Sequence, residues 1–146
     1  PTEIHDDPQA LQVLGEIAAT TGRRRRAGWF DAEIVRFSVQ IAGVDALFLT
    51  KLDVLSAFER IKVCVGYRYR GEMVHYVDLD SYQLSEVEPI YEELPGWQEE
   101  IGHIRDYESL PAPARRYVEH LEQLIGVPVR WISVGPEREA VIIRPL

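Results

Sequence analysis

The stretch "DALFLTKLD" (residues 45–53) decides the fold class. Its first six residues, 45–50, centre on a continuous apolar run, which is typical of a strand buried in the sheet of an α/β protein. The segment 50–53, "TKLD", follows at the carboxyl end of that strand, where open α/β sheets bind their ligands. The stretch therefore predicts a buried strand with a binding loop directly after it.

The segments on both sides alternate between the apolar periods of helices and of strands. Helices are expected at 8–17, at 31–42 behind an Asp31 cap, and at 111–126 with Gly126 as the stop. Strands are expected at 61–69 and 73–79, joined as a hairpin around 70–72, and at 87–94, 127–133 and 140–144. This mixture predicts an α/β fold with a short antiparallel hairpin.

The composition is that of one soluble globular domain. The 146 residues are 46% hydrophobic, and 16 Lys and Arg against 24 Asp and Glu give a net charge of −8. An acidic surface repels polyanions, and no run approaches the length of a membrane span. The single cysteine, Cys64, excludes an internal disulfide and fits a reducing compartment. We therefore expect a cytoplasmic protein with no nucleic-acid or membrane partner. The four histidines show no metal-ligand spacing, so no metal site is expected in this chain.

Lys51 and Asp53, with one residue between them, have side chains suited to binding a guanine base. A carboxylate can accept parallel hydrogen bonds from the N1–H and the exocyclic amine of guanine, whereas adenine presents an acceptor at N1. A buried polar group left unpaired costs about 1–3 kcal/mol, which is enough for discrimination between the two bases. The Lys51 stem can lie on the purine face. Taken alone, the pattern fits a surface Lys–Asp pair at a strand end equally well.

Two further loops could bind a ligand. "SVGP" (133–136) follows the strand expected at 127–133; Ser133 supplies a hydroxyl and Gly135 permits close approach of the backbone, although a plain turn would look the same. "ATTGRRRRAGWFD" (19–31) contains four consecutive arginines in an acidic chain. Nucleic acid, a membrane surface and a small anion are the candidate partners of these arginines, and the net charge disfavours the first.

Taken together, the segments closely resemble adenylosuccinate synthetase. They are, in order, "TTGRRRRAGWFD", "LTKLDVL", "IKVCVGY", "PIYEELPGW", "ARRYVEHLEQLIGVPV" and "ISVGPER". The resemblance covers essentially all of residues 1–146 as a single segment, but only about the C-terminal third of that enzyme. It implies a part of that family's mixed, largely parallel, P-loop-NTPase-like sheet, with the N-terminal phosphate-loop portion absent.

The resemblance also implies a function. The family is a magnesium-dependent homodimeric ligase that uses GTP to form adenylosuccinate from IMP and L-aspartate in de novo AMP biosynthesis. Its phosphate loop, magnesium ligands, catalytic aspartate and catalytic histidine lie upstream of the matched part. Residues 1–146 contain no G-x-x-x-x-G-K-[ST] substitute, so no catalytic residue is expected here and the chain alone should not catalyse the reaction.

The binding residues implied by the resemblance fall into three sets. The aspartate loop matches Ala19, Thr20, Thr21, Gly22, Arg23, Arg24 and Arg25, and Arg23 also matches an IMP contact. The GTP site matches Arg25, Lys51, Leu52, Asp53, Ser133, Val134 and Gly135. Val134 departs from the threonine that is usual in the family.

Two other functions are compatible with these residues. The chain could be a stand-alone, catalytically inactive guanine-nucleotide-binding module, which would bind GDP in preference to ADP. It could also be an arginine-dependent nucleic-acid binder, whose affinity would fall steeply with salt. A phosphate loop in upstream sequence would favour the ligase.

Overall fold

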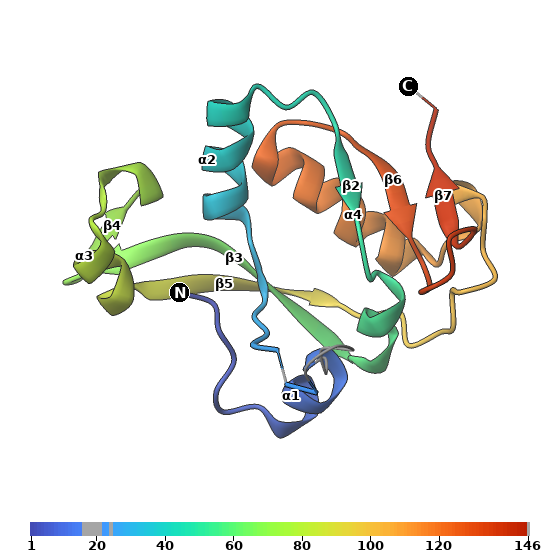
Figure 1. Cartoon of the computed structure of the whole chain (residues 1–146), viewed down its shortest axis with the longest axis horizontal. Coiled ribbons are helices and arrows are strands. Elements are labelled where there is room, and N and C mark those ends of the chain that lie inside the picture. Colours follow the sequence, from blue (N-terminus) through green and yellow to red (C-terminus); the bar gives the residue numbers. More distant parts are fainter. Residues whose placement is uncertain (16–21, 24, 146) are drawn as a thin grey trace.

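The computed structural model describes residues 1–15, 22–23 and 25–145 (Figure 1). The helices are α1 (Pro8–Leu14), α2 (Ala32–Ala42), α3 (Ser81–Glu86) and α4 (Ala112–Ile125), with the short 3-10 helices η1 (Asp53–Ala57), η2 (Tyr76–Asp78) and η3 (Tyr107–Ser109). The strands are β1 (Phe30–Asp31), β2 (Leu47–Leu49), β3 (Arg60–Tyr69), β4 (Glu72–Val74), β5 (Glu88–Pro95), β6 (Val129–Ser133) and β7 (Val141–Ile143).

The strands form two sheets. In one, β3 pairs with β5 along one edge and with β1 and β4 along the other; the second sheet has the order β2-β6-β7. Among the described residues, the β1–β3 and β2–β6 pairs are parallel and the other three pairs are antiparallel. Figure 1 shows β3 and β5 as a long ribbon, with β2, β6 and β7 beside α4 on its right. The expected mixed α/β class is confirmed.

The helix boundaries follow from capping residues in the sequence. The Asp31 side chain accepts hydrogen bonds from the N–H groups of Glu33 and Ile34 at the start of α2, as expected. Gly126, in the left-handed conformation at φ 80°, ends α4 at the expected place. The first helix is shorter than the expected 8–17, because it reaches its cap at Gly15. Residues 16 and 17 lie outside the described residues.

The segment 73–79 is not one strand, contrary to expectation. Strand β4 ends at Val74 and the chain turns into η2. The cause lies on another element: the buried Glu33 carboxylate of α2 accepts the Tyr76 N–H at 3.0 Å and lies 3.2 Å from the His75 ring. The Tyr76 backbone therefore pairs with a helix side chain instead of a neighbouring strand.

The strand expected to be buried at 45–50 is also different in the structure. Strand β2 is only three residues long, and its central residue, Phe48, is 52% exposed and stacks on Trp131 of β6. Leu47 and Leu49 pack on the main core from the opposite face. The apolar run thus reflects one partly buried face and one aromatic outer face rather than burial on both.

The main core lies between α4, β3 and the β2-β6-β7 sheet. Helix α4 contributes residues at helical spacing, among them Val118, Leu121 and Ile125, to the same cluster as Ile61 and Ile132. Helix α2 packs against both β3 and α4, and the Arg36 side chain donates a 2.8 Å hydrogen bond to the Leu124 carbonyl. The core thereby fixes β3 relative to the β2–β6 pair.

Cys64 belongs to a second, smaller cluster with Tyr67 and Val87. The Tyr67 hydroxyl donates to the carboxylate of Asp31, the residue that caps α2. Burial raises the pKa of the Cys64 thiol to about 11, so it stays a protonated core side chain, as its position in an apolar strand indicates. No helix in the described part of the chain is long and apolar enough to span a membrane.

The close approach of β5 to the segment after η1 requires glycine at position 96. The Gly96 N–H donates to the Glu59 carbonyl at 2.8 Å, and a Cβ at Gly96 would lie 1.9 Å from the Phe58 carbonyl oxygen. We expect Gly96→Ala to lower the free energy of unfolding by about 1–3 kcal/mol, because the backbone must move apart. Urea unfolding measures this. In the control Gly102→Ala the new Cβ would sit 3.5 Å from the nearest atom, and a comparable loss there would contradict the explanation.

Candidate functional site

The loops after β2 and β6 meet at one edge of their sheet. The two strands are adjacent and parallel, so their carboxyl ends point the same way. The Leu52 N–H donates to the Ser133 carbonyl at 3.2 Å, which joins the loops 50–53 and 133–136. The two ligand-binding candidates from the sequence are therefore neighbours in space.

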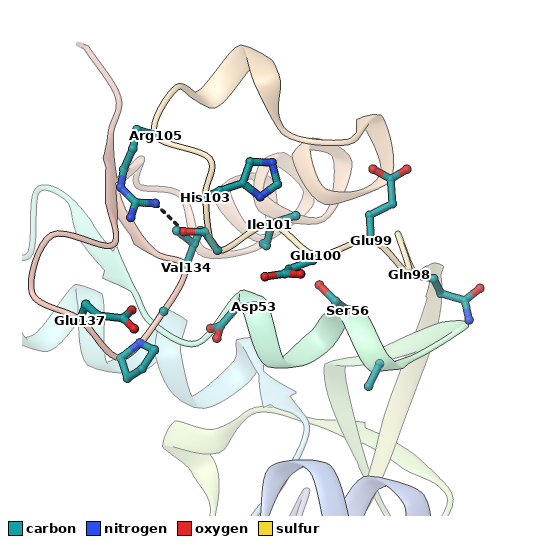
Figure 2. Close-up of a pocket in the computed structure, with 14 residues that line it drawn as sticks. Asp53, Ser56, Gln98, Glu99, Glu100, Ile101, His103, Arg105, Val134 and Glu137 are labelled. Atoms are coloured by element: carbon teal, nitrogen blue, oxygen red, sulfur yellow. Dashed lines mark hydrogen bonds between the residues drawn. The ribbon is translucent and has the colours of Figure 1, made fainter.

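A cavity of about 660 Å³ opens beside this junction. It is lined by Asp53, Ser56 and Ala57 of η1, by the loop 134–137, and by 98–103 with Arg105. Figure 2 shows the Asp53 carboxylate on the side of η1 that faces the loop of Val134 and Glu137. Asp53 is half-buried, so hydrogen bonds to its oxygens are partly shielded from water.

The loop 133–136 holds its shape through its own hydrogen bonds. The Ser133 hydroxyl donates to the Gly135 carbonyl at 3.0 Å, and the Val134 N–H donates to the Ala140 carbonyl at 2.9 Å. Val134, which is fully buried, and Gly135 both line the cavity, and a Cβ at Gly135 would lie 2.8 Å from the Glu137 carboxylate. Val134 and Gly135 are thus wall residues, and the Ser133 side chain bonds within the loop.

Lys51 and Asp53 do not line the same cavity. Lys51 lines a second cavity of about 180 Å³, together with Trp29 and Lys62. Leu52, between them in sequence, is fully buried. Lys51 also adopts a left-handed backbone conformation at φ 62°, which a residue with a Cβ rarely does. The structure thus places Asp53, Val134 and Gly135 in the lining of one cavity and Lys51 in the lining of another.

The arginine segment is described only in part. Arg23 and Arg25 are exposed, and Gly22 has a positive φ of 66°. Arg26 pairs with Glu3, donating from Nε to Oε1 at 2.7 Å and from Nη2 to Oε2, and this hydrogen bonding lowers the pKa of the Glu3 carboxyl. The predicted residues Ala19, Thr20, Thr21 and Arg24 lie outside the described residues.

Sequence reasoning missed the segment 98–105 as a cavity wall. Its side chains include Glu99, Glu100 and His103. Its one signal is the preceding "LPGW", which predicts a turn but not what the turn covers. Arg105 is held by the segment itself, since its Nη1 donates to the Gly102 carbonyl at 2.6 Å and the Ile104 carbonyl at 3.0 Å.

The charge of the cavity limits what it can hold. Its described lining includes four carboxylates (Asp53, Glu99, Glu100 and Glu137) and one guanidinium, that of Arg105. Such a lining favours a neutral group with N–H donors and disfavours phosphate. Within the ranges 1–15, 22–23 and 25–145, no group of three or more His, Cys, Asp or Glu side chains is placed to hold a metal ion.

Comparisons with known proteins identify the family of the chain. The family model of adenylosuccinate synthetase matches residues 1–142. The chain belongs to the adenylosuccinate synthetase family. It is 48% identical over 145 residues to the adenylosuccinate synthetase of Trichlorobacter lovleyi, and 51% identical over 146 residues to that of Mycobacterium leprae. These matches cover 98% and 99% of this chain and 34% of each relative, so the chain spans about a third of the curated relatives it matches.

A solved structure has the same fold. The fully ligated adenylosuccinate synthetase of Plasmodium falciparum superposes with a TM-score of 0.90 at 33% identity, covering 99% of this chain and 35% of that one. The likeness extends over β2, β6 and the loops between which the cavity lies, because nearly all of the chain is matched.

The left-handed backbone at Lys51 gives a test of local strain in this member of the adenylosuccinate synthetase family. We expect the Lys51→Gly variant to be more stable than Lys51→Ala by about 0.5–1 kcal/mol, because only the alanine keeps a Cβ in that conformation. Both variants lose the same side chain, so the difference in unfolding free energy isolates the backbone. At Lys62, within β3, the order should reverse. Equal stability of the two Lys51 variants would show that the backbone is unstrained.

Proposed function

We propose that this chain supplies the guanine-binding and aspartate-binding loops of a GTP-dependent ligase, which forms adenylosuccinate from IMP and L-aspartate on the route to AMP. The observation that carries the proposal is the match to one enzyme family over residues 1–142, combined with Asp53 in a cavity at the sheet edge. The proposal treats residues 1–146 as a single C-terminal segment. The phosphate loop and the catalytic aspartate and histidine then belong to the preceding part, and the chain alone is not competent.

Guanine recognition rests on Asp53. Its half-buried carboxylate can accept the N1–H and the exocyclic amine of guanine, while an adenine ring would oppose it with a lone pair. Val134 and Gly135 close the opposite wall, and Leu52 and Ser133 join the two loops through their backbones. Lys51 lines the second cavity, and its stem is proposed to lie on the purine face.

The arginine segment is the proposed anion site. Planar guanidinium groups bind carboxylates and phosphates in bidentate fashion, and threonine hydroxyls with loop N–H groups complete such a cradle. By analogy with the family, L-aspartate is held by Ala19, Thr20, Thr21, Gly22, Arg23, Arg24 and Arg25. Arg23 also contacts IMP, and Arg25 reaches the phosphates of GTP. In this proposal the guanidinium groups stabilise the negative charge that develops during phosphoryl transfer.

The reaction implied by the family has two steps. The 6-oxygen of IMP takes the γ-phosphoryl group of GTP, and the aspartate amine then displaces that phosphate. The part assigned to this chain is binding: it fixes the guanine end of GTP and holds the aspartate carboxylates. Mg²⁺ would bind to ligands outside this chain, and the complete enzyme is proposed to be a cytoplasmic homodimer with GTP, IMP and L-aspartate as its partners.

Asp53→Asn in the complete protein that carries this chain tests the base assignment. The asparagine amide would direct its own N–H₂ at the exocyclic amine of guanine, so we expect the KM for GTP to rise about tenfold or more. Xanthosine triphosphate has a carbonyl in place of that amine and should become the better donor. Initial rates with both nucleotides, at saturating IMP and L-aspartate, measure the preference.

The exposed Asp45, just before β2, is the matched control, because Asp45→Asn makes the same charge change at the other end of the strand. An unchanged preference for guanine in Asp53→Asn would contradict the base assignment. If the complete wild-type protein forms no adenylosuccinate but binds GDP in preference to ADP, the stand-alone binding module replaces the ligase.

A further inference from the structure

The carboxylate proposed to read guanine stands on a weak element. Asp53 is the first residue of η1, a five-residue 3-10 helix that has no side-chain cap hydrogen bond. Its ends are marked by the hydrogen bonds from the Leu55 N–H to the Leu52 carbonyl and from the Phe58 N–H to the Leu55 carbonyl. Short 3-10 segments have poor hydrogen-bond geometry and depend on their surroundings. The direction of the Asp53 carboxylate therefore depends on what holds η1.

Ser56 lies on the same face of η1 as Asp53 and anchors that helix through a hydrogen bond. Residues i and i+3 eclipse one another in a 3-10 helix, and both Asp53 and Ser56 line the large cavity (Figure 2). The Ser56 hydroxyl oxygen accepts a 2.7 Å hydrogen bond from the indole Nε1–H of Trp97. Fixing Ser56 fixes the rotation of η1 about its axis, and hence the direction in which Asp53 points.

Trp97 is itself rigidly placed. It is 5% exposed, it packs against Tyr117 of α4 with ring centroids 5.9 Å apart, and it follows Gly96, whose N–H is bound to Glu59. A buried indole N–H without an acceptor is unfavourable, so the hydrogen bond to Ser56 is stabilised. Trp97 is not among the residues that line the cavity, so it can affect a ligand there only through its neighbours.

Trp97 also directly precedes the segment 98–103, which forms one wall of the cavity. Gln98, the next residue, adopts a left-handed conformation at φ 47° and directs the chain along the cavity toward the fully buried Ile101. Trp97 thus joins three parts: the core at α4, the helix that bears Asp53, and the wall at 98–103.

We propose that Trp97 is a positioning residue for guanine recognition, which holds the Asp53 carboxylate in register with the base through its hydrogen bond to Ser56. The inference rests on the proposed function, since it assumes that the cavity receives guanine. It assigns Trp97 no contact with the nucleotide. Its consequence is a loss of base specificity when the indole N–H is removed, even though every residue that touches the base remains.

The experiment compares two phosphoryl donors, GTP and inosine triphosphate, with the complete protein at saturating IMP and L-aspartate. Inosine triphosphate lacks the exocyclic amine of guanine. Trp97→Phe keeps an aromatic ring and removes the N–H. We expect the ratio of kcat/KM for GTP to that for inosine triphosphate to fall about three- to tenfold, less than for complete loss of a hydrogen bond to a charged group, because the bonds to Asp53 are weakened and not removed. The change should lie mainly in the KM for GTP, with kcat largely retained.

Ser56→Ala provides a second route that leaves the tryptophan packing in place. It should lower the ratio in the same direction, and the double variant should be no worse than the stronger single variant, because both remove one bond. Tyr107→Phe is the matched control: it deletes the buried hydroxyl that donates to the Arg115 carbonyl at 3.3 Å, at a residue outside the cavity lining. It should change stability and leave the ratio unchanged.

The outcomes separate this inference from the proposed function. If the wild-type protein itself does not favour GTP over inosine triphosphate, the guanine assignment of the cavity fails. If the wild type favours GTP and both Trp97→Phe and Ser56→Ala keep the same ratio, the positioning role is wrong. Additive losses in the double variant would also overturn it, because Trp97 and Ser56 would then act separately.

Discussion

The site depends on the parallel pairing of β2 with β6. Parallel neighbours in a sheet bring their carboxyl ends to one edge, and the Leu52 N–H to Ser133 carbonyl bond extends the pairing into the loops. Two loops that are far apart in the sequence, 50–53 and 133–136, become two walls of one cavity. Without this register Asp53 and Gly135 would not line one cavity.

The walls differ in how they are held. The loop 133–136 is held by its own hydrogen bonds and by the fully buried Val134, so it is rigid where it meets the cavity. Helix η1 and the segment 98–103 are anchored by the packing of three buried residues, Leu52, Trp97 and Ile101. The polar residues that face the cavity are thus held in place by buried neighbouring residues. Lys51 and Gln98, each in the lining of one of the two cavities, have left-handed backbone, a conformation that stores local strain in residues with a Cβ.

Local signals in the sequence predicted much of the fold. The Asp31 cap, the Gly126 stop and the hairpin turn at 70–72 each depend on a residue and its near neighbours, and all three are observed. The errors arose where a distant residue decides. Glu33 of α2 takes the backbone N–H of Tyr76 and ends the strand expected to continue to 79, and the ring of Trp131 covers one side of Phe48 without burying it.

The candidate site divides in the same way. The Thr-Lys-Leu-Asp and Ser-Val-Gly-Pro loops could be recognised in the sequence because a strand end and a glycine are local features. That Lys51 and Asp53 line different cavities could not be predicted, because it follows from the burial of Leu52 and the left-handed backbone at Lys51. The wall at 98–103 was also invisible, since its place beside η1 is fixed by the Trp97–Ser56 bond and by packing on α4 rather than by any motif.

Charge explains how the proposed site can be shared between this chain and the rest of the enzyme. A base is neutral and is read by hydrogen bonds at short range, so one cavity with a half-buried carboxylate is sufficient for it. A triphosphate needs cations, and the described lining of this cavity has more carboxylates than guanidinium groups. The phosphates of a nucleotide bound here must therefore leave the cavity toward positive charge elsewhere. In the proposed enzyme that charge comes from the arginine segment and from the phosphate loop outside this chain, so the nucleotide itself spans the two parts.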